Sequence, residues 1–224
     1  MKFSIIIPTL NEEELIEDLI SKTRKLGDCE IIIVDGGSED KTLEKATHAD
    51  QVIQSDPGRA LQQNRGASQS HGEVLIFLHA DCFLEPGALE AIEKTLQDKN
   101  VIAGCFHQKI EADGLRYRLL ELGNALRVQL FKWMYGDQAI FARREIFEEL
   151  GRFPEIGLME DLYLSKKLKK RGKLKILSPP VHISARRWKK NGVVRQTFKN
   201  WSMVFRVHCG QSPDQLSRYY PHIR

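Results

Sequence analysis

Small and acidic residues follow three short apolar runs in this sequence of 224 residues. The first group, residues 8–12, contains Pro8, Thr9, Asn11 and Glu12. The second group, residues 35–40, starts at Asp35, and the third group, residues 79–81, has the sequence His-Ala-Asp. Any one of these groups alone is typical of a loop and a helix cap. In an open parallel sheet, ligands bind at the carboxyl ends of the strands, so three groups at neighbouring strand ends predict a ligand site.

The chemistry of these groups suits a nucleoside diphosphate. A carboxylate such as Asp35 can accept hydrogen bonds from a base or a ribose, and Gly36 and Gly37 let the backbone approach a ligand closely. Asp81 suits a Mg²⁺ or Mn²⁺ ion, which binds one or two carboxylates together with phosphate oxygens and water, and His79 would add a nitrogen ligand. The patterns GxGxxG and GxxxxGK[ST] are absent, which argues against a dinucleotide dehydrogenase and a P-loop NTPase.

An acidic pair, Glu160 and Asp161, could supply a general base. A reaction in which a hydroxyl displaces a diphosphate needs a carboxylate that takes the hydroxyl proton and a cation that stabilises the departing diphosphate, and Asp161 and Asp81 fit these roles. Positive groups near the leaving phosphates would help, and His182 and Arg187 follow the last expected strand. The alternative is that the acidic pair only favours the start of a helix through the helix dipole.

The elements that must position these residues alternate between strands and helices. Short β-branched runs predict buried strands over residues 3–7, 30–34, 51–54 and 74–78. Helical spacing predicts helices over residues 11–26, 38–47 and 60–70, with Asn11 as the N-cap of the first. This alternation predicts an α/β fold whose parallel sheet carries helices on both faces.

Beyond Asp81 the alternation changes. Helices are expected over residues 86–97, 115–133, 143–150 and 160–171. Strands are expected over residues 101–110, 136–142 and 174–177, with Pro179 and Pro180 closing the last one. These strands are expected to add a second sheet element, and a basic helical tail is expected over residues 184–206.

Six segments in this order resemble one known family: SIIIPTLNEEE, VDGGSEDKT, GRALQQNRGA, IFLHAD, GDQAIF and LMEDLYLSKKLKKRG. Together they resemble glycosyltransferase family 2, the GT-A fold of nucleotide-sugar transferases, over about residues 1–190. The resemblance implies a Rossmann-like nucleotide-binding sheet, a smaller acceptor-side sheet and C-terminal helices, with a GT-A domain over 1–183 and a basic helical extension over 184–224. Small bacterial members of the type associated with arsenosugar biosynthesis look most similar, because of the SARRW run and the HAD step.

The resemblance also implies site residues and substrates. It assigns contacts with a nucleotide-diphosphate sugar to Pro8, Thr9, Asn11, Glu12, Asp35, Gly37, Arg59, Asn64, Ala80, Asp81, Arg187 and Trp188. Asp81 matches the last acid of the family's DxD metal motif and His79 takes the place of the first, so the site for Mn²⁺ or Mg²⁺ loses one negative charge. His182 is expected as a further metal ligand.

The catalytic residues implied by the resemblance are acidic. Asp161 matches the usual base of inverting members, Glu160 precedes it in the family's ED pair, and Asp137 falls where the family lines the acceptor site. The end of the QxxRW motif is present at Arg187 and Trp188, but Ser184 stands where Gln would be, so processive synthesis is not implied. The expected enzyme is therefore an inverting, metal-dependent hexosyltransferase that acts on a hydroxyl acceptor.

The charge distribution leaves alternatives open. Residues 1–161 hold 18 Lys and Arg against 29 Asp and Glu, whereas residues 162–224 hold 16 Lys and Arg against the single acid Asp214. Such a basic block is a solvated helix face or attracts phosphates, nucleic acid or an anionic membrane. The alternative function is a basic membrane- or nucleic-acid-binding module with a non-catalytic GT-A-like domain. The acidic first 161 residues argue against nucleic acid as a partner. A nucleotidyltransferase would need a glycine-rich loop with Arg and Lys, which PTLNEEE lacks.

Composition and apolar patterning predict the compartment. The sequence has 42% hydrophobic residues, four cysteines without a CxxC pair and no apolar run of about 18 residues. A cytoplasmic protein is expected, with peripheral contact at the inner face of the membrane as an option. The apolar helix over 115–133 and the basic tail are expected to contact a lipid-linked or amphipathic acceptor, and a homodimer interface is the alternative for the same apolar residues.

Overall fold

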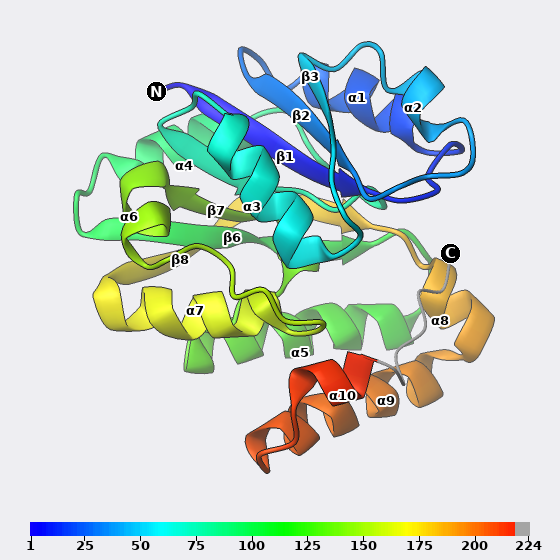
Figure 1. Cartoon of the computed structure of the whole chain (residues 1–224). Coiled ribbons are helices and arrows are strands. Elements are labelled where there is room, and N and C mark those ends of the chain that lie inside the picture. The colour runs from blue at the N-terminus through cyan, green and yellow to red at the C-terminus, as the bar shows by residue number, and fades with distance from the viewer. Residues whose placement is uncertain (218–224) are drawn as a thin grey trace.

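The computed structural model describes residues 1–217, and the last seven residues of the expected C-terminal extension lie outside this range (Figure 1). Eight strands form a single mixed sheet in the order β3-β2-β1-β4-β7-β6-β8-β5. Their bounds are β1 Phe3–Thr9, β2 Glu30–Asp35, β3 Gln51–Gln54, β4 Val74–Phe77, β5 Cys82–Leu84, β6 Val101–Ile110, β7 Ile140–Arg143 and β8 Lys173–Ile183. The predicted α/β class with a GT-A arrangement is confirmed.

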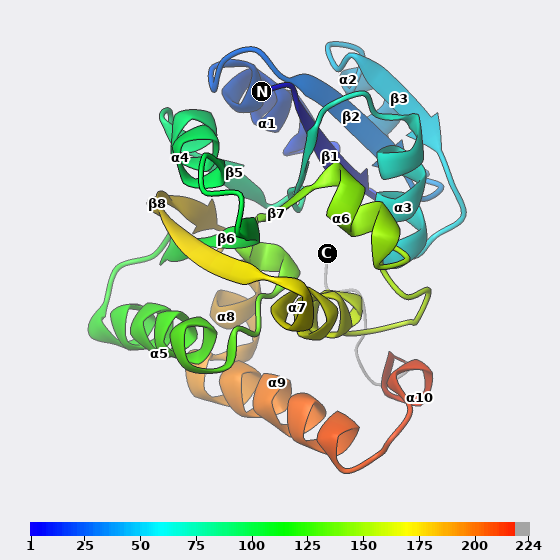
Figure 2. The same ribbon diagram turned by 90° about the vertical axis from the view of Figure 1, so that its left-hand side faces the viewer.

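Helices cover both faces of the sheet because successive side chains of each strand point to opposite sides. Ile5 and Ile7 of β1 pack in one core cluster with residues of α1 (Ile16–Arg24) and α4 (Ala88–Leu96). Ile6 packs in a second cluster with residues of α3 (Arg59–Gln69), α6 (Arg144–Glu149) and α7 (Glu160–Arg171). Figure 2 shows α1 and α4 on one side of the sheet and α3 and α6 on the other.

The strands expected in a smaller sheet are instead continuous with the first one. β7 pairs antiparallel with both β4 and β6, and β8 pairs parallel with β6 and antiparallel with β5. The expectation that the prolines end the last strand is wrong, because β8 continues to Ile183. The register with β6 jumps from Leu177 to Val181, so Pro179 and Pro180 fall in a bulge that needs no ladder N–H group.

Three other expectations need local correction. Asn11 is not an N-cap: α1 begins at Ile16, and the Asn11 side chain instead accepts a hydrogen bond of 2.9 Å from the Glu39 N–H. The helix expected over residues 38–47 is only α2, Thr42–Lys45. The strand expected over residues 136–142 begins at Ile140, because Gly136–Gln138 form a single 3₁₀ turn, η1.

Helix α5 (Leu115–Phe131) and the C-terminal helices lie below the sheet in the views of Figures 1 and 2. The C-terminal helices are α8 (Arg186–Asn191), α9 (Val193–His208) and α10 (Pro213–Ser217). The tail expected as one helix is broken at Gly192, whose φ of 78° is strained for other residues. No helix in the described part of the chain combines the length and apolar character that crossing a membrane requires.

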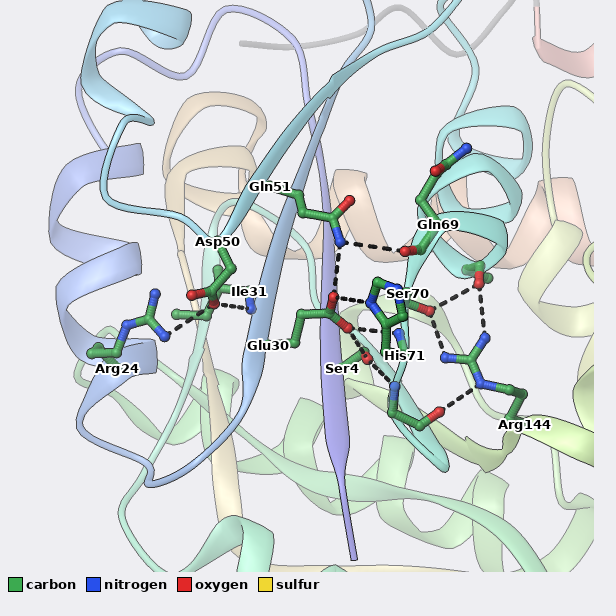
Figure 3. A network of polar contacts seen from close by, with 12 residues as sticks. Ser4, Arg24, Glu30, Ile31, Asp50, Gln51, Gln69, Ser70, His71 and Arg144 are labelled. Carbon is green, nitrogen blue, oxygen red and sulfur yellow. Dashed lines mark hydrogen bonds and ion pairs between the residues drawn. The ribbon is translucent and has the colours of Figure 1, made fainter.

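A polar network closes the N-terminal end of the sheet (Figure 3). The Glu30 carboxylate accepts hydrogen bonds from the Ser4 hydroxyl (2.6 Å), the Gln51 amide (2.8 Å) and the His71 backbone N–H (2.8 Å). Burial alone would raise the pKa of Glu30, but these bonds outweigh it and lower the pKa below its ordinary value. Arg144 extends the network by donating to the Gly72 carbonyl and the Ser70 hydroxyl. The network therefore joins the starts of β1, β2 and β3 to the loop after α3 and to the start of α6.

Candidate active site

A pocket of about 170 Å³ opens at the opposite end of the sheet, near the carboxyl ends of the parallel strands. Its walls come from the loop after β4, the η1 turn, the start of α7, the end of β8 and helices α8 and α9. The sequence-predicted residues that line it are Arg59, His79, Asp81, Asp137, Asp161, Arg187 and Trp188. This is the strand-end position that the alternation of strands and helices predicts for a ligand.

A group of potential metal ligands lies in this pocket. One ligand atom each from His79, Asp81 and Cys82 can be chosen so that all lie within 4.8 Å of one another. The Nε2 atom of His79 is buried and has no hydrogen-bond partner in the described part of the chain. Burial lowers the pKa of His79 to about 3, so the ring is neutral and keeps a lone pair. An imidazole nitrogen and a carboxylate together fit a divalent cation, and the carboxylate of Asp81 fits Mg²⁺ as well as Mn²⁺.

Asp161 stands at the start of α7, where two backbone groups orient it. The Gly136 N–H donates to Oδ2 at 2.7 Å and the Leu162 N–H donates to Oδ1 at 2.6 Å. Burial and then the neighbouring Glu160 raise the pKa of Asp161 to about 6, although these hydrogen bonds oppose the rise. The carboxylate is therefore ionised at neutral pH and can take up a proton more readily than an exposed Asp.

The η1 turn needs glycine because it passes close to the metal-ligand group. A Cβ atom at Gly136 would come within 2.4 Å of His79 Nε2. Arg127 of α5 supports the turn, since its guanidinium donates to the Gln138 side chain at 2.8 Å and lies 3.6 Å from the centre of the Tyr135 ring. The turn thereby brings the backbone of Gly136 against both His79 and Asp161.

Asp137 points a second carboxylate into the pocket region. Its Oδ1 atom is buried without a partner among the described residues. Burial raises the pKa of Asp137, while Arg127 opposes this effect and the carboxylates of Asp161 and Asp81 add to it. A buried acceptor that lacks a partner is suited to a hydroxyl donor from a ligand.

Positive and aromatic side chains complete the walls. Arg59 lies 4.0 Å from Glu160, measured between Nη1 and Oε1, and Glu160 is almost fully buried at 3% exposure. Arg187 and Trp188 line the pocket from α8, and the Trp188 indole N–H is buried without a partner in the described residues. The neighbouring Arg186 instead lies on the outside and contacts Glu12 at 3.4 Å.

Several residues expected to bind the nucleotide do not line this pocket, namely Pro8, Thr9, Asn11, Glu12, Asp35, Gly37, Asn64 and Ala80. Asp35 is fully buried, and its carboxylate accepts hydrogen bonds from the N–H groups of Gly37 (2.9 Å) and Ser38 (2.8 Å). The Asn64 side chain clamps the backbone of Phe153 through two hydrogen bonds. Asp35 therefore holds the loop after β2, and Asn64 holds the segment between α6 and α7.

The structure does not bring His182 to the metal-ligand group, so the expectation for this residue is corrected. Its Nδ1 atom contacts Glu111 at 2.5 Å and its Nε2 atom contacts Glu85. The ring also stacks on Phe83, with 4.4 Å between ring centres. Because β8 points residue 182 away from the pocket and Ile183 toward it, the imidazole ties β8 to neighbouring loops.

Sequence reasoning missed part of the pocket wall, which comes from Tyr135, Met159, Gln196, Asn200 and Met203. Gln196 is 2% exposed and donates to the Asn200 side chain at 2.8 Å. The available signal was the spacing of these two amides, four residues apart on a helix whose other polar residues are mostly basic. Their place beside Asp81 depends on the return of the chain after β8, which the spacing alone does not predict.

Comparison with known proteins agrees with this arrangement. The family model described as "Glycosyl transferase family 2" matches residues 4–159. A PGL/p-HBAD biosynthesis glycosyltransferase of Mycobacterium bovis is 31% identical over 168 residues, which cover 67% of this chain and 62% of the relative. The O-antigen chain rhamnosyltransferase WbaN of Salmonella anatum is 27% identical over 191 residues, covering 74% of this chain and 60% of the relative. The chain thus spans about three fifths of the length of these relatives.

Solved structures share the fold. The mannosyltransferase PcManGT from Pyrobaculum calidifontis, in complex with GDP-Man and Mn²⁺, superposes with a TM-score of 0.66 at 21% identity, over 81% of this chain and 56% of that chain. TarS 1-349 of S. aureus, in complex with UDP-GlcNAc, also gives 0.66 at 19% identity, over 82% of this chain and 58% of that chain. The family model covers more than half of the sequence, and a match of this extent shows which family the chain belongs to. This chain belongs to glycosyl transferase family 2.

Proposed function

We propose that this chain transfers a sugar from a nucleotide-diphosphate sugar to an acceptor hydroxyl, with inversion at the anomeric carbon and with the help of Mn²⁺ or Mg²⁺. The observation that supports this most is one pocket that holds both the His79 and Asp81 ligand group and the Asp161 carboxylate. A cation site and a base are the two parts that inverting transfer requires.

The donor side of the pocket is assigned to the cation and the leaving group. His79 and Asp81 would hold the divalent cation, which when bound neutralises charge on the departing diphosphate. Arg59 and Arg187 line the same pocket and supply positive charge for the phosphates. The Trp188 N–H, which has no partner among the described residues, can donate a hydrogen bond to an oxygen of the nucleotide sugar.

The acceptor side is assigned to Asp161, with Asp137 and Glu160 beside it. The acceptor oxygen attacks the anomeric carbon, the bond from that carbon to the phosphate oxygen breaks, and the hydroxyl proton moves to the Asp161 carboxylate. The Gly136 N–H fixes the carboxylate for this step. We assign Asp137, whose Oδ1 lacks a partner in the described chain, to orienting the acceptor.

Two relatives, one named as a PGL/p-HBAD biosynthesis glycosyltransferase and one as an O-antigen chain rhamnosyltransferase, support the reaction class. We further propose that residues 1–183 form the GT-A domain and residues 184–224 an extension that completes its pocket, since α8 and α9 supply part of the wall. Kinship with arsenosugar-associated members stays a prediction.

Thermal unfolding in the presence of a panel of nucleotide sugars, with and without Mn²⁺, tests the proposal. A ligand that binds only the folded state raises its stability, so one donor class should raise the unfolding temperature more when Mn²⁺ is present. Asp81→Ala should abolish the metal-dependent part, whereas Asp113→Ala, an exposed acid outside the pocket, should not. An unchanged metal dependence in Asp81→Ala would reject the assigned cation site.

A further inference from the structure

Helices α5 and α9 lie on the lower side of the molecule in Figures 1 and 2. Each of them exposes a stripe of apolar side chains to solvent. On α5 the stripe consists of Leu115, Leu119, Leu122, Leu126 and Leu130, with exposures between 45% and 73%. On α9 they are Val194, Phe198, Trp201 and Phe205, with exposures between 59% and 69%. Each set repeats every three to four residues, so each forms one stripe along its helix. These stripes are far more apolar than an ordinary helix surface.

The opposite faces of both helices are attached to the body of the protein. Val128 of α5 is buried in the core, and Asn124 donates to the Gln108 side chain at 2.6 Å. On α9, Gln196, Asn200 and Met203 line the pocket. The stripes therefore face away from the sheet, and α9 carries the pocket wall on one face and the aromatic stripe on the other.

Positive charge surrounds the aromatic stripe. Residues 186–208 contain seven Lys and Arg and no Asp or Glu. Lys190 and Arg195 are exposed close to Val194, and Arg206 is exposed next to Phe205. At the end of α5, Phe131 stacks on Trp133 with 5.1 Å between ring centres, and Lys166 of α7 lies 5.6 Å from the Trp133 ring. Aromatic residues with nearby Lys and Arg are typical of helices that lie in a membrane interface.

We propose that the stripes of α5 and α9 form one face that binds the surface of an anionic lipid bilayer. Charge complementarity favours this occupant over a second copy of the chain. In a two-fold dimer the same patch meets itself, so the acid-free segment 186–208 would face its own positive charge. An anionic bilayer instead attracts these residues and accepts the leucines and aromatics beneath its headgroups.

The position of α9 between the pocket and the proposed membrane face also limits the chemical class of the acceptor. This consequence rests on the proposed function. Because α9 separates the pocket from the bound bilayer by one helix, an acceptor with an apolar tail could keep its tail in the membrane while its hydroxyl reaches Asp161. The acceptor class is thus an amphipathic, lipid-bearing hydroxyl compound. Bilayer binding itself needs no sugar transfer, so the two claims fail separately.

Co-sedimentation with lipid vesicles tests the surface. The full chain should sediment with phosphatidylcholine vesicles that contain roughly one third phosphatidylglycerol, and high salt or pure phosphatidylcholine should weaken the binding. The double variants Phe198→Ser with Trp201→Ser and Lys190→Glu with Arg195→Glu should each bind about tenfold more weakly. Leu61→Ser, which removes an exposed leucine from α3, is the matched control and should bind as the wild type does.

Thermal unfolding and donor binding by each variant separate loss of the surface from loss of the fold. The proposal is overturned if the wild type fails to sediment at low salt, if it sediments equally with neutral vesicles, or if folded variants bind as tightly as the wild type. A dimer in light scattering that the Phe198→Ser and Trp201→Ser pair dissociates, without vesicle binding by the wild type, would assign the face to a second copy instead. A failed donor titration with intact vesicle binding would reject only the proposed function.

Discussion

The two ends of the central sheet differ in how their polar side chains are paired. At the N-terminal end, Glu30 accepts hydrogen bonds from Ser4, Gln51 and His71 (Figure 3). At the C-terminal end, the pocket holds buried atoms without partners. Of the four buried side-chain atoms that lack a partner in the described chain, three belong to pocket residues: His79 Nε2, Asp137 Oδ1 and Trp188 Nε1.

The fold gains stability at the paired end of the sheet and loses stability at the pocket. A buried polar group without a partner costs about 1–3 kcal/mol, so three of them in one pocket are a substantial cost. A ligand that supplies the missing partners recovers that cost on binding. The paired end should therefore govern unfolding and the unpaired end should govern ligand binding and transfer.

The largest expected effect comes from Asp161→Asn. The amide cannot accept the proton of the attacking oxygen, so release of nucleoside diphosphate from the donor, with water as the acceptor, should slow by at least about 100-fold while donor affinity is kept. Because burial raises the pKa of Asp161 to about 6, its charge destabilises the folded state increasingly as the pH rises from the ordinary Asp pKa to the folded-state pKa. Asp113→Asn is the control. Turnover within a few-fold of the wild type would assign the base to Glu160 or Asp137.

The next largest effect, a loss of stability without a loss of donor affinity, is expected for Glu30→Gln. The amide places a donor against N–H and O–H donors, which should lower the free energy of unfolding by about 2 kcal/mol without changing donor affinity. The folded-state pKa of Glu30 is lowered, so its stabilisation is present above the ordinary Glu pKa and is lost as the pH falls through the folded-state pKa. Urea denaturation at several pH values measures the free energy of unfolding of both proteins, and Glu90→Gln, a change at an exposed residue, is the control. Equal stability of wild type and variant near pH 7 would contradict the comparison.

The smallest effect concerns metal preference. Mg²⁺ favours oxygen ligands and Mn²⁺ accepts imidazole readily, so His79→Asp should raise Mg²⁺ affinity relative to Mn²⁺ by about tenfold. Calorimetric titration of both ions into the donor-saturated protein measures the ratio. His48→Asp places the same charge on an exposed position and should leave the ratio unchanged. A ratio that moves equally in both variants would mean that His79 is not a ligand.

The parallel half of the sheet was the most predictable part of the fold. The β-branched runs of β1, β2 and β4 are buried on both faces, so their hydrophobicity alone indicates strands. The helix expected over residues 160–171 coincides with α7, because an acidic first turn and a basic last turn both agree with its dipole. At these positions the local sequence preferences and the tertiary structure favour the same secondary structure.

Other positions depend on contacts that no local pattern encodes. Asn11 adopts a φ of 54° because its loop binds Ser38 and Glu39, which delays the start of α1. β8 continues past Pro180 because the bulge opposite β6 accommodates residues without ladder hydrogen bonds. His182 was expected in the site, but the alternation of side chains along β8 turns it to Glu85 and Glu111.

The candidate site was predictable where it follows strand ends and less so elsewhere. His79, Asp81 and Asp161 come together because they stand at the ends of elements, near the carboxyl ends of the parallel strands. Gln196 and Asn200 reach the same pocket only because Gly192 breaks the tail into two helices. A break of this kind changes which face of the following helix meets the sheet.

The pH dependence of turnover is the most direct test of the role of Asp161 as the base. Nucleoside diphosphate release by the wild type, at saturating donor and Mn²⁺ with water as the acceptor, should fall by about tenfold per pH unit below a pKa of about 6, because protonated Asp161 cannot accept the proton of the attacking oxygen. The residual activity of Asp161→Asn should lack this acid limb. A wild-type rate that stays constant from pH 7 to about pH 5, or an acid limb that persists in the folded variant, would contradict the account.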